Sequence, residues 1–505
     1  MYIFCYWGAL FLEMKKNNIM LIGCGPHAQR IYLPLIEKHK KEFNLNLSVV
    51  VEVYKKREEI SDYFFNKQIG PELYFVTIKN EAEFDLSIED RIKLKEIIQK
   101  NNIKIIILSS DPLSHKAYLD FALEEGINVL TDKPITSRIK ASTSIEQAKK
   151  ILEDYHHLVK KYRNAEEKFP GIIVSCLSQR RYHPAINKIK SELERVHAIT
   201  NCPVTSIVCQ HSDGQWRMPD EIVNIDYHGY QKGIGKCSHS GYHFFDIMFW
   251  YTQISKEKTH DEIRCYANFV HPKDWISQIN IEDHKKIFGD CYSSEKFSIT
   301  TEEFVDKTKE FGEIDAHINV TLMKQKKKIT NITFSLLHNG FSKRSWINPK
   351  NDLYKGNGRI RHETHIIHQG PFQALYYVSY QSDQIDNDIL KGSGLIGGEL
   401  HADVYIFRNS KALGIDLPEF EIIQFGKVNE LGLQGYSRGH QEDARGSCFY
   451  EFMLAINGEI PKGKLKSSIE SHEGSVALMS LAYLSAAKQH NNENPISKYQ
   501  EGILD

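Results

Sequence analysis

The turn Gly23-Cys24-Gly25-Pro26-His27-Ala28 decides the fold of the first part of this chain. It stands between an apolar segment, 19–22, and a predicted helix from about residue 28 to 38. Its spacing fits G-x-G-x-x-G/A, in which the first glycine makes a tight turn, the second admits a pyrophosphate and the small third residue packs helix on strand. Free N–H groups at the helix start favour an anion. The stretch, including Pro26 and His27, predicts a dinucleotide-binding turn; a purely structural glycine turn is the alternative.

An acidic residue follows at the distance that such a turn requires. Glu52 lies at the end of the second apolar segment, 47–53, where a carboxylate can accept hydrogen bonds from the hydroxyls of an adenosine ribose. Lys55, Lys56 and Arg57 come directly after it and are able to hold a 2′-phosphate instead. Because the carboxylate would repel that phosphate, we expect NAD as the cofactor, with NADP as the alternative.

Apolar segments of strand length alternate with helical segments through the first third of the chain. Predicted strands cover residues 19–22, 47–53, 103–108 and 127–130, and predicted helices cover 28–38, 88–100 and 113–125. This alternation is typical of parallel strands joined by helical crossovers, so it predicts an α/β fold with a doubly wound Rossmann domain.

The second part of the chain has a different pattern. Residues 317–323 and 329–336 alternate apolar and polar side chains around a basic turn, which is typical of an antiparallel hairpin with one buried face. We therefore expect a C-terminal α+β domain with a large open, mostly antiparallel sheet. The expected divisions are an N-terminal extension at 1–13, the Rossmann domain at 14–168 and the substrate and oligomerisation domain at 169–505, with an insertion at 255–313.

Composition restricts the class of protein. A chain of 505 residues is too long for one ordinary core, so two domains are expected. A net charge of −1 gives no reason to expect a nucleic-acid or membrane partner. Nine cysteines without a CxxC pair indicate reduced thiols in a cytoplasmic protein. Residues 1–12 are apolar but too short to cross a bilayer, and we interpret them as an extension or an upstream start rather than a signal peptide.

A second motif ends the predicted strand 127–130. Its residues are Thr131-Asp132-Lys133-Pro134, and the lysine puts a positive charge on the rim of the sheet where a nicotinamide would lie. Three further segments follow the same order as in a known family: Ser109-Ser110-Asp111-Pro112-Leu113-Ser114-His115, then Arg180-Arg181-Tyr182-His183-Pro184, and Gly235-Lys236-Cys237-Ser238-His239-Ser240-Gly241-Tyr242-His243-Phe244-Phe245-Asp246.

Together these segments resemble the glucose–fructose oxidoreductase, inositol dehydrogenase and rhizopine catabolism family (Gfo/Idh/MocA). The resemblance implies that Lys133 hydrogen-bonds the reacting oxygen and stabilises a developing alkoxide, and that His243 is the general base. It also implies that the Lys133–Pro134 peptide bond is cis. The residues that it places around the cofactor are Ser109, Asp111, Pro112, His115, Asp132, Lys133 and Pro134.

One position departs from the family pattern. His239 stands where many members have a catalytic aspartate, four residues before the histidine, and an imidazole supplies no fixed negative charge. His239 therefore either takes part in substrate binding, or the proton route is altered, or dehydrogenase activity is lost. Asp246 lies three residues after His243 and is able to orient its ring on a helix; a packing carboxylate is the alternative.

Several other polar residues have both a functional and a structural interpretation. Arg181 and Tyr182 are candidate substrate contacts or parts of a salt-bridged strand end. Trp216 and Arg217 are able to stack on and hold a sugar or phosphate, or to anchor a loop. His239 and His243 share the i, i+4 spacing of zinc ligands, and His211 and His228 lie upstream. Without an H-E-x-x-H motif or paired cysteines, however, we expect no metal.

The function that this sequence predicts is oxidation of a carbinol on a sugar, sugar derivative or cyclitol, with hydride passing to NAD(P). The resemblance implies a homodimer or homotetramer formed through the open sheet. Two alternatives stay open. One is a net non-redox enzyme with bound NAD, such as a glycosidase that works through transient oxidation, and the other is a non-catalytic NAD-binding regulatory protein.

Overall fold

The computed structural model describes residues 16–77, 84–224, 228–255, 259–289, 299–342, 360–381, 401–425, 440–500 and 502–505, so the predicted extension at 1–13 lies outside it. Contacts between Cα atoms divide the chain into two compact units. Unit 1 consists of residues Met1–Thr131, Asn164–Ser175 and Phe449–Leu465, and unit 2 of Asp132–Arg163, Cys176–Cys448 and Lys466–Asp505. The sequence predicts a single domain boundary, between residues 168 and 169. In the structure each unit consists of three separate segments of the chain.

Unit 1 is formed around a six-stranded sheet in the order β3-β2-β1-β4-β5-β6. The strands are β1 (Asn17–Ile22), β2 (Leu45–Val53), β3 (Glu72–Val76), β4 (Ile103–Leu108), β5 (Asn128–Thr131) and β6 (Val174–Cys176). The pairs β1–β2, β1–β4, β2–β3 and β4–β5 are parallel. All six residues of β1 are buried, as expected for a central parallel strand. The predicted doubly wound sheet is confirmed.

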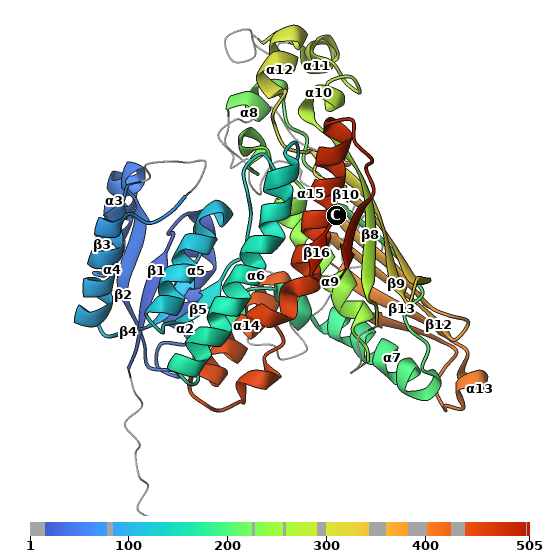
Figure 1. Cartoon of the computed structure of the whole chain (residues 1–505), viewed down its shortest axis with the longest axis horizontal. Helices are drawn as coiled ribbons and strands as arrows, with labels where there is room; N and C mark the ends of the chain where they lie inside the picture. The colour runs from blue at the N-terminus through green and yellow to red at the C-terminus, as the bar shows by residue number, and fades with distance from the viewer. Residues whose placement is uncertain are drawn as a thin grey trace, which may run out of the picture. The chain divides into compact units, whose positions relative to one another are not determined.

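Most helices of unit 1 connect these strands (Figure 1). The helices are α1 (Pro26–Arg30), α2 (Tyr32–Lys38), η1 (Tyr54–Lys56), α3 (Arg57–Lys67), α4 (Ile88–Lys100), η2 (Pro112–Ser114), α5 (His115–Glu124) and η8 (Lys462–Lys464). The single helix predicted at 28–38 is in fact two, α1 and α2. Pro34 has no N–H to donate to the carbonyl of Arg30, and its ring crowds that carbonyl, so the helix breaks between them.

Unit 2 contains a ten-stranded sheet in the order β14-β13-β12-β11-β7-β10-β9-β8-β15-β16. The strands are β7 (Ser206–Ser212), β8 (Glu262–Val270), β9 (Asp315–Lys324), β10 (Lys327–Leu337), β11 (Arg361–Gln369), β12 (Gln373–Gln381), β13 (His401–Arg408), β14 (Phe420–Gln424), β15 (Ser497–Gln500) and β16 (Ile503–Leu504). Strands β7 and β10 pair in parallel, the other described neighbours in this sheet pair antiparallel, and the predicted hairpin is β9–β10. The large, mostly antiparallel sheet is thereby confirmed.

One face of this sheet is covered by helices (Figure 1), which include α7 (Pro184–Thr200), α9 (Tyr242–Thr252) and α15 (Glu473–His490). Along β8 the buried residues Ile263, Cys265 and Ala267 alternate with exposed ones, which sets the apolar side chains against α15. Shorter helices of the unit are η3 (Gln179–Tyr182), α8 (Pro219–Asn224), η4 (Tyr230–Lys232), η5 (Cys237–Gly241), α13 (Ser410–Leu413) and η9 (Ile469–His472). Two longer helices, α6 (Ile145–Lys168) and α14 (His440–Ile456), contribute residues to both units.

The segment expected to be an insertion, 255–313, has two parts. Its β8 pairs with β9 and β15 and so belongs to the main sheet. The helices α10 (Pro272–Trp275), α11 (Ile281–Phe288) and α12 (Thr301–Thr308) instead share a separate small core with α8, which contains Ile222, Trp275 and Phe304. The helices α10 to α12 therefore fit the expected insertion, whereas β8 is an integral strand of the main sheet.

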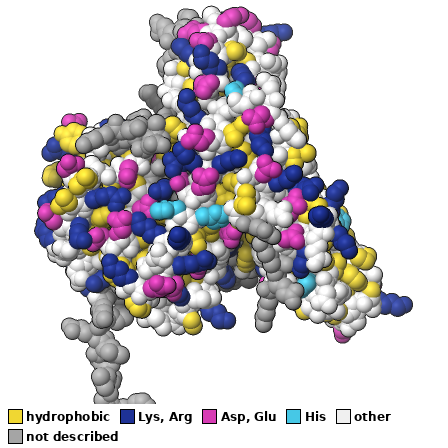
Figure 2. Space-filling view, in the orientation of Figure 1, with side chains coloured by type: hydrophobic (Ala, Val, Ile, Leu, Met, Phe, Trp, Pro, Cys, Tyr) yellow, Lys and Arg dark blue, Asp and Glu magenta, His cyan; other side chains and the backbone are white. Residues whose placement is uncertain are grey.

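The charged side chains on the surface are mixed in sign, as the net charge of −1 leads us to expect. On the face shown in Figure 2, Lys and Arg side chains are interspersed with Asp and Glu side chains. Among the described residues, no helix combines the length and the apolar composition needed to cross a membrane.

Candidate functional site

The glycine turn of unit 1 joins β1 to α1. Gly23 has φ of +85°, and a Cβ atom there would lie 2.6 Å from the main-chain carbonyl carbon of Ser109, so only glycine fits. Gly25 is the N-cap of α1, with Pro26 at the first helical position. Ala28 is buried, as the packing role of the third small residue requires. Because Gly23 and Gly25 have no side chains, a pyrophosphate would be able to approach the backbone of this turn closely.

Glu52 is positioned by the same turn. One carboxylate oxygen accepts from the main-chain N–H of Cys24 at 2.8 Å, and the other accepts from the N–H of Val53 at 2.9 Å. Each oxygen keeps a lone pair for a further donor such as a ribose hydroxyl. The Nζ atom of Lys56 would lie 3.8 Å from a Cβ on Gly25, so a cation also stands beside the turn. Burial, and secondarily the charge of Glu52, raises the pKa of Cys24 to about 12, so this thiol stays neutral.

The turn after β4 is held together by its own side chains. The carboxylate of Asp111 accepts from the N–H of Leu113 at 3.0 Å and caps η2, which begins at Pro112. The ring of His115 is fully buried, with Nε2 at 3.2 Å from the main-chain oxygen of Ser110. This contact fixes the shape of the loop at the carboxyl end of the strand, where ligands of such sheets bind.

Lys133 and His239 meet in unit 2. The ammonium of Lys133 donates to the main-chain oxygen of His239, and the peptide bond from Lys133 to Pro134 is cis. His243 is buried close by. Burial holds its pKa well below the usual 6.5, and the charges of Lys133 and then Arg180 lower it further. The imidazole of His243 is therefore neutral at neutral pH and able to accept a proton.

His239 and His243 do not share one α-helical face. Residues Cys237–Gly241 form a π-helical turn ahead of α9, in which the N–H of Gly241 donates to the oxygen of Lys236 at 2.7 Å. The wider turn rotates His239 away from His243. A spacing of i, i+4 predicts a shared face only where the α-helix is uninterrupted, and here it is not.

Buried groups hold the π-helical turn in place. The carboxylate of Glu313 accepts from the N–H of Cys237 at 2.7 Å, and the hydroxyl of Tyr483 accepts from the N–H of Ser238 at 3.0 Å. Tyr483 in turn donates to Glu313 at 3.0 Å. Sequence reasoning does not single out either residue, because both lie far along the chain from the motif that they support.

Arg181, a candidate substrate contact, and Asp246, a candidate for orienting His243, are both part of the core. The guanidinium of Arg181 donates to Asp246 at 2.6 Å and also to Lys466 and Ser471, which uses its N–H groups internally. Asp246 also accepts from Ser178 and Ser475, with His472 at 3.2 Å. The side chains of the pair are 2% and 0% exposed. For Arg181 and Asp246 the structure therefore favours the structural alternatives, a salt-bridged strand end and a packing carboxylate.

The other predicted substrate contacts have mixed surroundings. Tyr182 is buried, with the Lys466 ammonium 5.3 Å from the centre of its ring. Trp216 packs on Phe288 of α11, with ring centres 5.1 Å apart, so it anchors a loop. Arg217 lines a small cavity of about 10 Å³, and its Nε donates to Gln215 at 3.1 Å. Arg217 therefore keeps its place as a candidate ligand contact.

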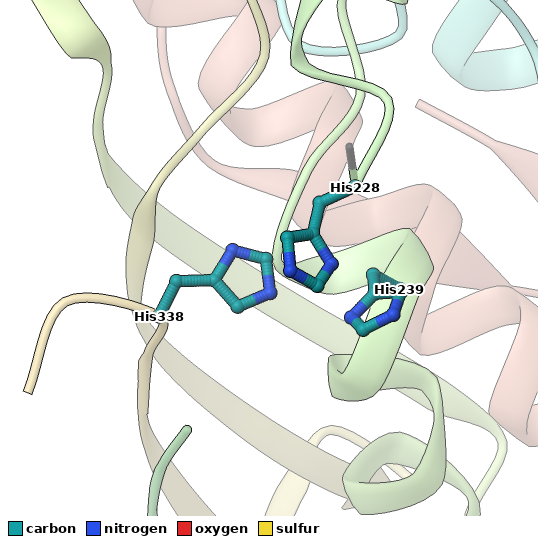
Figure 3. Close-up of side chains that lie close together, drawn as sticks. All are labelled: His228, His239 and His338. Atoms are coloured by element: carbon teal, nitrogen blue, oxygen red, sulfur yellow. The ribbon is translucent and has the colours of Figure 1, made fainter. Parts of the chain in front are cut away.

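A cluster that sequence reasoning does not foresee lies beside the π-helical turn. His239 meets His228 and His338 rather than His243, and one ring nitrogen from each of the three lies within 4.8 Å of the others (Figure 3). His338 follows the end of β10, and only the fold of the sheet brings it to the other two. No spacing rule in the sequence links it to them.

The fold and the glycine turn define a dinucleotide-binding Rossmann domain joined to an open-sheet domain. Residues 17–161 match the sequence profile of the Gfo/Idh/MocA family, described as an oxidoreductase family with an NAD-binding Rossmann fold. The match covers the N-terminal part of the chain, where it supports the predicted resemblance to this family and the predicted class of cofactor. No curated protein matches the chain.

Solved structures extend the likeness of fold to nearly the whole chain. An oxidoreductase from Agrobacterium radiobacter, crystallised with NAD+, L-tartaric acid and magnesium, aligns with a TM-score of 0.52 and 12% identity over 96% of this chain and 98% of its own. The WlbA dehydrogenase from Bordetella pertussis, in complex with NADH and UDP-GlcNAcA, gives 0.51 and 12% over 97% and 98%. At this identity the likeness concerns the fold alone.

Proposed function

We propose that this protein is an NAD-dependent oxidoreductase that oxidises a carbinol of a sugar, sugar derivative or cyclitol. The observation that carries the proposal is the Lys133 ammonium, fixed on the oxygen of His239 in the same region as the neutral imidazole of His243. A positive charge and a proton acceptor are the two groups that removal of a hydride from a CH–OH carbon requires of the protein.

Two residues of this site have different roles: one stabilises negative charge and the other accepts a proton. Lys133 would hydrogen-bond the substrate oxygen and stabilise the alkoxide that develops as the hydride leaves. His243 would accept the hydroxyl proton. Since Lys133 and Arg180 both disfavour an imidazolium, the proton would have to pass onward to solvent rather than remain on His243. Asp246 acts in the opposite direction and raises the pKa of His243, but its influence is smaller than those of Lys133 and Arg180, and its carboxylate is bound to Arg181.

The residues of unit 1 fit a nicotinamide dinucleotide. Gly23 and Gly25 would admit the pyrophosphate, and Glu52 would accept from the ribose hydroxyls. When bound, the oxidised nicotinamide supplies the hydride acceptor. Glu52 supports NAD over NADP, since its carboxylate faces the turn, although Lys56 provides a cation that an additional phosphate would use.

Replacement of Lys133 by alanine tests the proposal. NADH binding, measured by fluorescence, should be unchanged, and turnover of a responsive polyol should fall by about 10²–10³-fold, the usual cost of one lost donor to a developing oxyanion. The matched control is K160A, which removes an exposed lysine from α6 and should retain full turnover. Equal turnover by K133A and K160A would contradict the role of Lys133.

The screen for that polyol also separates the alternatives. Sugars, cyclitols and nucleotide sugars are offered with NAD and with NADP, and nicotinamide absorbance is followed. Tight cofactor binding without any response to a polyol would favour the non-catalytic regulatory protein. Cofactor that copurifies and cycles without net consumption of added NAD would favour the net non-redox enzyme.

The open sheet offers a surface for a homodimer. One face carries the exposed side chains of Phe407 on β13 and of its partner Phe420 on β14, and the exposed Ile422 of β14 pairs with the half-buried Tyr405. The ring centres of Phe407 and Phe420 are 5.0 Å apart. Exposed apolar surface of this kind is typical of subunit contacts. F407D should therefore shift the molar mass measured by light scattering toward the monomer, and an unchanged oligomer would contradict this interface.

A further inference from the structure

Three histidines from separate segments converge in unit 2. His228 precedes η4, His239 lies in the π-helical turn and His338 follows β10 (Figure 3). The ring centres of His228 and His239 are 3.9 Å apart, and those of His228 and His338 are 4.4 Å apart. Three imidazoles at these distances form a compact set of nitrogen donors.

Neighbouring groups select which nitrogen of two rings points into the cluster. The Nε2 atom of His228 lies 3.0 Å from the side-chain oxygen of Gln215. That oxygen only accepts, so Nε2 carries the proton and Nδ1 keeps its lone pair. The Nδ1 atom of His338 lies 2.5 Å from the hydroxyl of Tyr230, which leaves Nε2 on the cluster side. Partners of this kind fix the tautomer and orientation of metal-binding histidines.

The backbone of His228 has an uncommon conformation. Its φ is +66°, in the left-handed region that glycine adopts without cost and other residues adopt rarely. Residues held in such conformations are concentrated at binding and catalytic sites. This conformation places the His228 ring in the cluster and lets a glycine replace the residue there without backbone strain.

We propose that His228, His239 and His338 bind one zinc ion, through Nδ1 of His228 and Nε2 of His338. Zinc–nitrogen bonds of about 2.0–2.1 Å place the donors of a tetrahedral site roughly 3.3 Å apart. The present separations of up to 4.8 Å would close to this value by small rotations of the three side chains.

The charges around the cluster suit a cation with an anionic fourth ligand. The carboxylate of Asp213 lies 3.6 Å from Nε2 of His338 and is held by Lys236 at 2.7 Å and Ser240 at 2.6 Å. A cation, Arg217, is joined to the cluster through Gln215 and would attract an anionic ligand.

Three protein donors leave one coordination position open, as in catalytic rather than structural zinc sites. The small cavity that Arg217 lines is also bounded by Gln215, Tyr230 and His338, and its volume of about 10 Å³ is close to that of one water molecule as the fourth ligand. If the proposed function holds, the ion would lie beside the reacting carbinol, since Lys133 contacts the main-chain oxygen of His239. The zinc would then polarise the substrate oxygen together with that ammonium.

Metal binding is tested on the full chain, first depleted with a chelator. Titration with Zn2+ should show one tight site, and Co2+ in its place should give the visible absorption of a tetrahedral ion. H228G, which suits the left-handed backbone, and H338A should each abolish the site. H317A removes an exposed imidazole from β9 of the same sheet and should leave it unchanged. A single equivalent lost in both cluster variants and retained in H317A supports the proposal.

Weaker effects are expected from the groups that orient the rings. Q215L and Y230F should each lower the zinc affinity by about 10–100-fold. Absence of a tight site in the full chain, or a site that survives both H228G and H338A, would overturn the proposal. Neither outcome depends on turnover, so loss of the zinc site leaves the Lys133 test of the oxidoreductase unaffected, and an inactive protein that binds zinc at these histidines leaves the metal site standing.

Discussion

Gly23 has the backbone geometry that the predicted dinucleotide-binding turn requires of its first glycine. Its φ of +85° and the 2.6 Å approach of the Ser109 backbone leave no room for a side chain. G23A should therefore destabilise unit 1 and abolish NADH binding. G70A is the matched control, because no described atom lies within 4 Å of a Cβ there, and it should bind NADH normally by fluorescence titration. Normal binding by G23A would show that the turn is not used for the cofactor.

Single residues also mark the limit of what the sequence predicts. Gly23, Glu52 and Lys133 belong to short motifs, so their places in the fold follow from strand ends that the sequence itself indicates. Asp246 does not. Helical spacing relates it to His243, but burial decides its partner, and the partner is Arg181. An ionised carboxylate with no exposed surface requires a counter-charge, and the sequence does not reveal which one lies nearest in space.

At the scale of elements, the π-helical turn at Cys237–Gly241 depends on Tyr483 of α15. Y483F removes the acceptor for the N–H of Ser238 and leaves this buried group unsatisfied, at a cost of about 1–3 kcal/mol. The free energy of unfolding in urea should fall by that amount. Because the turn carries His239, turnover should also fall.

A control for this substitution lies on the large sheet of the same unit. Y266F alters a tyrosine of β8 that is 40% exposed and touches no part of the turn, so its hydroxyl loses little when it is removed. The unfolding free energy of Y266F should change little and its turnover not at all. Equal effects of Y483F and Y266F would contradict a specific role for the turn.

The elements themselves are predictable to different degrees. Segment 19–22 is a continuous apolar run, and segment 103–108 is apolar except for Lys104. Strand β4 has the predicted bounds, and β1 begins at Asn17, two residues before the predicted start. The strand β8 is not predicted, because Arg264, Tyr266 and Asn268 give the segment a polar composition. These polar residues alternate with the buried Ile263 and Cys265, which is the pattern of a strand with one exposed face. The polar composition of the segment makes this pattern difficult to recognise in the sequence. The cluster at His228 has no such signal, since three distant segments form it.

At the scale of the whole molecule, buried neutral histidines make stability depend on pH. Burial lowers the pKa of His211, His243 and His472 below 6.5. Below about pH 6.5 the unfolded chain therefore binds more protons at these rings than the folded chain does, and stability rises with pH in that range. We expect the melting temperature to increase from pH 5 to about 6.5 and then to level off. A melting temperature that falls over this range would contradict the assignment.

The parallel pair β7–β10 has a consequence for how the protein is made. The other described strand pairs of the large sheet are antiparallel, yet β7 has β10 on one side and β11 on the other, and both are synthesised long after it. Until the ribosome has delivered them, β7 has two open edges and no partner within the sheet. Assembly of the sheet centre must therefore wait for a large loop to close, which favours slow folding and a nascent chain in need of protection against aggregation.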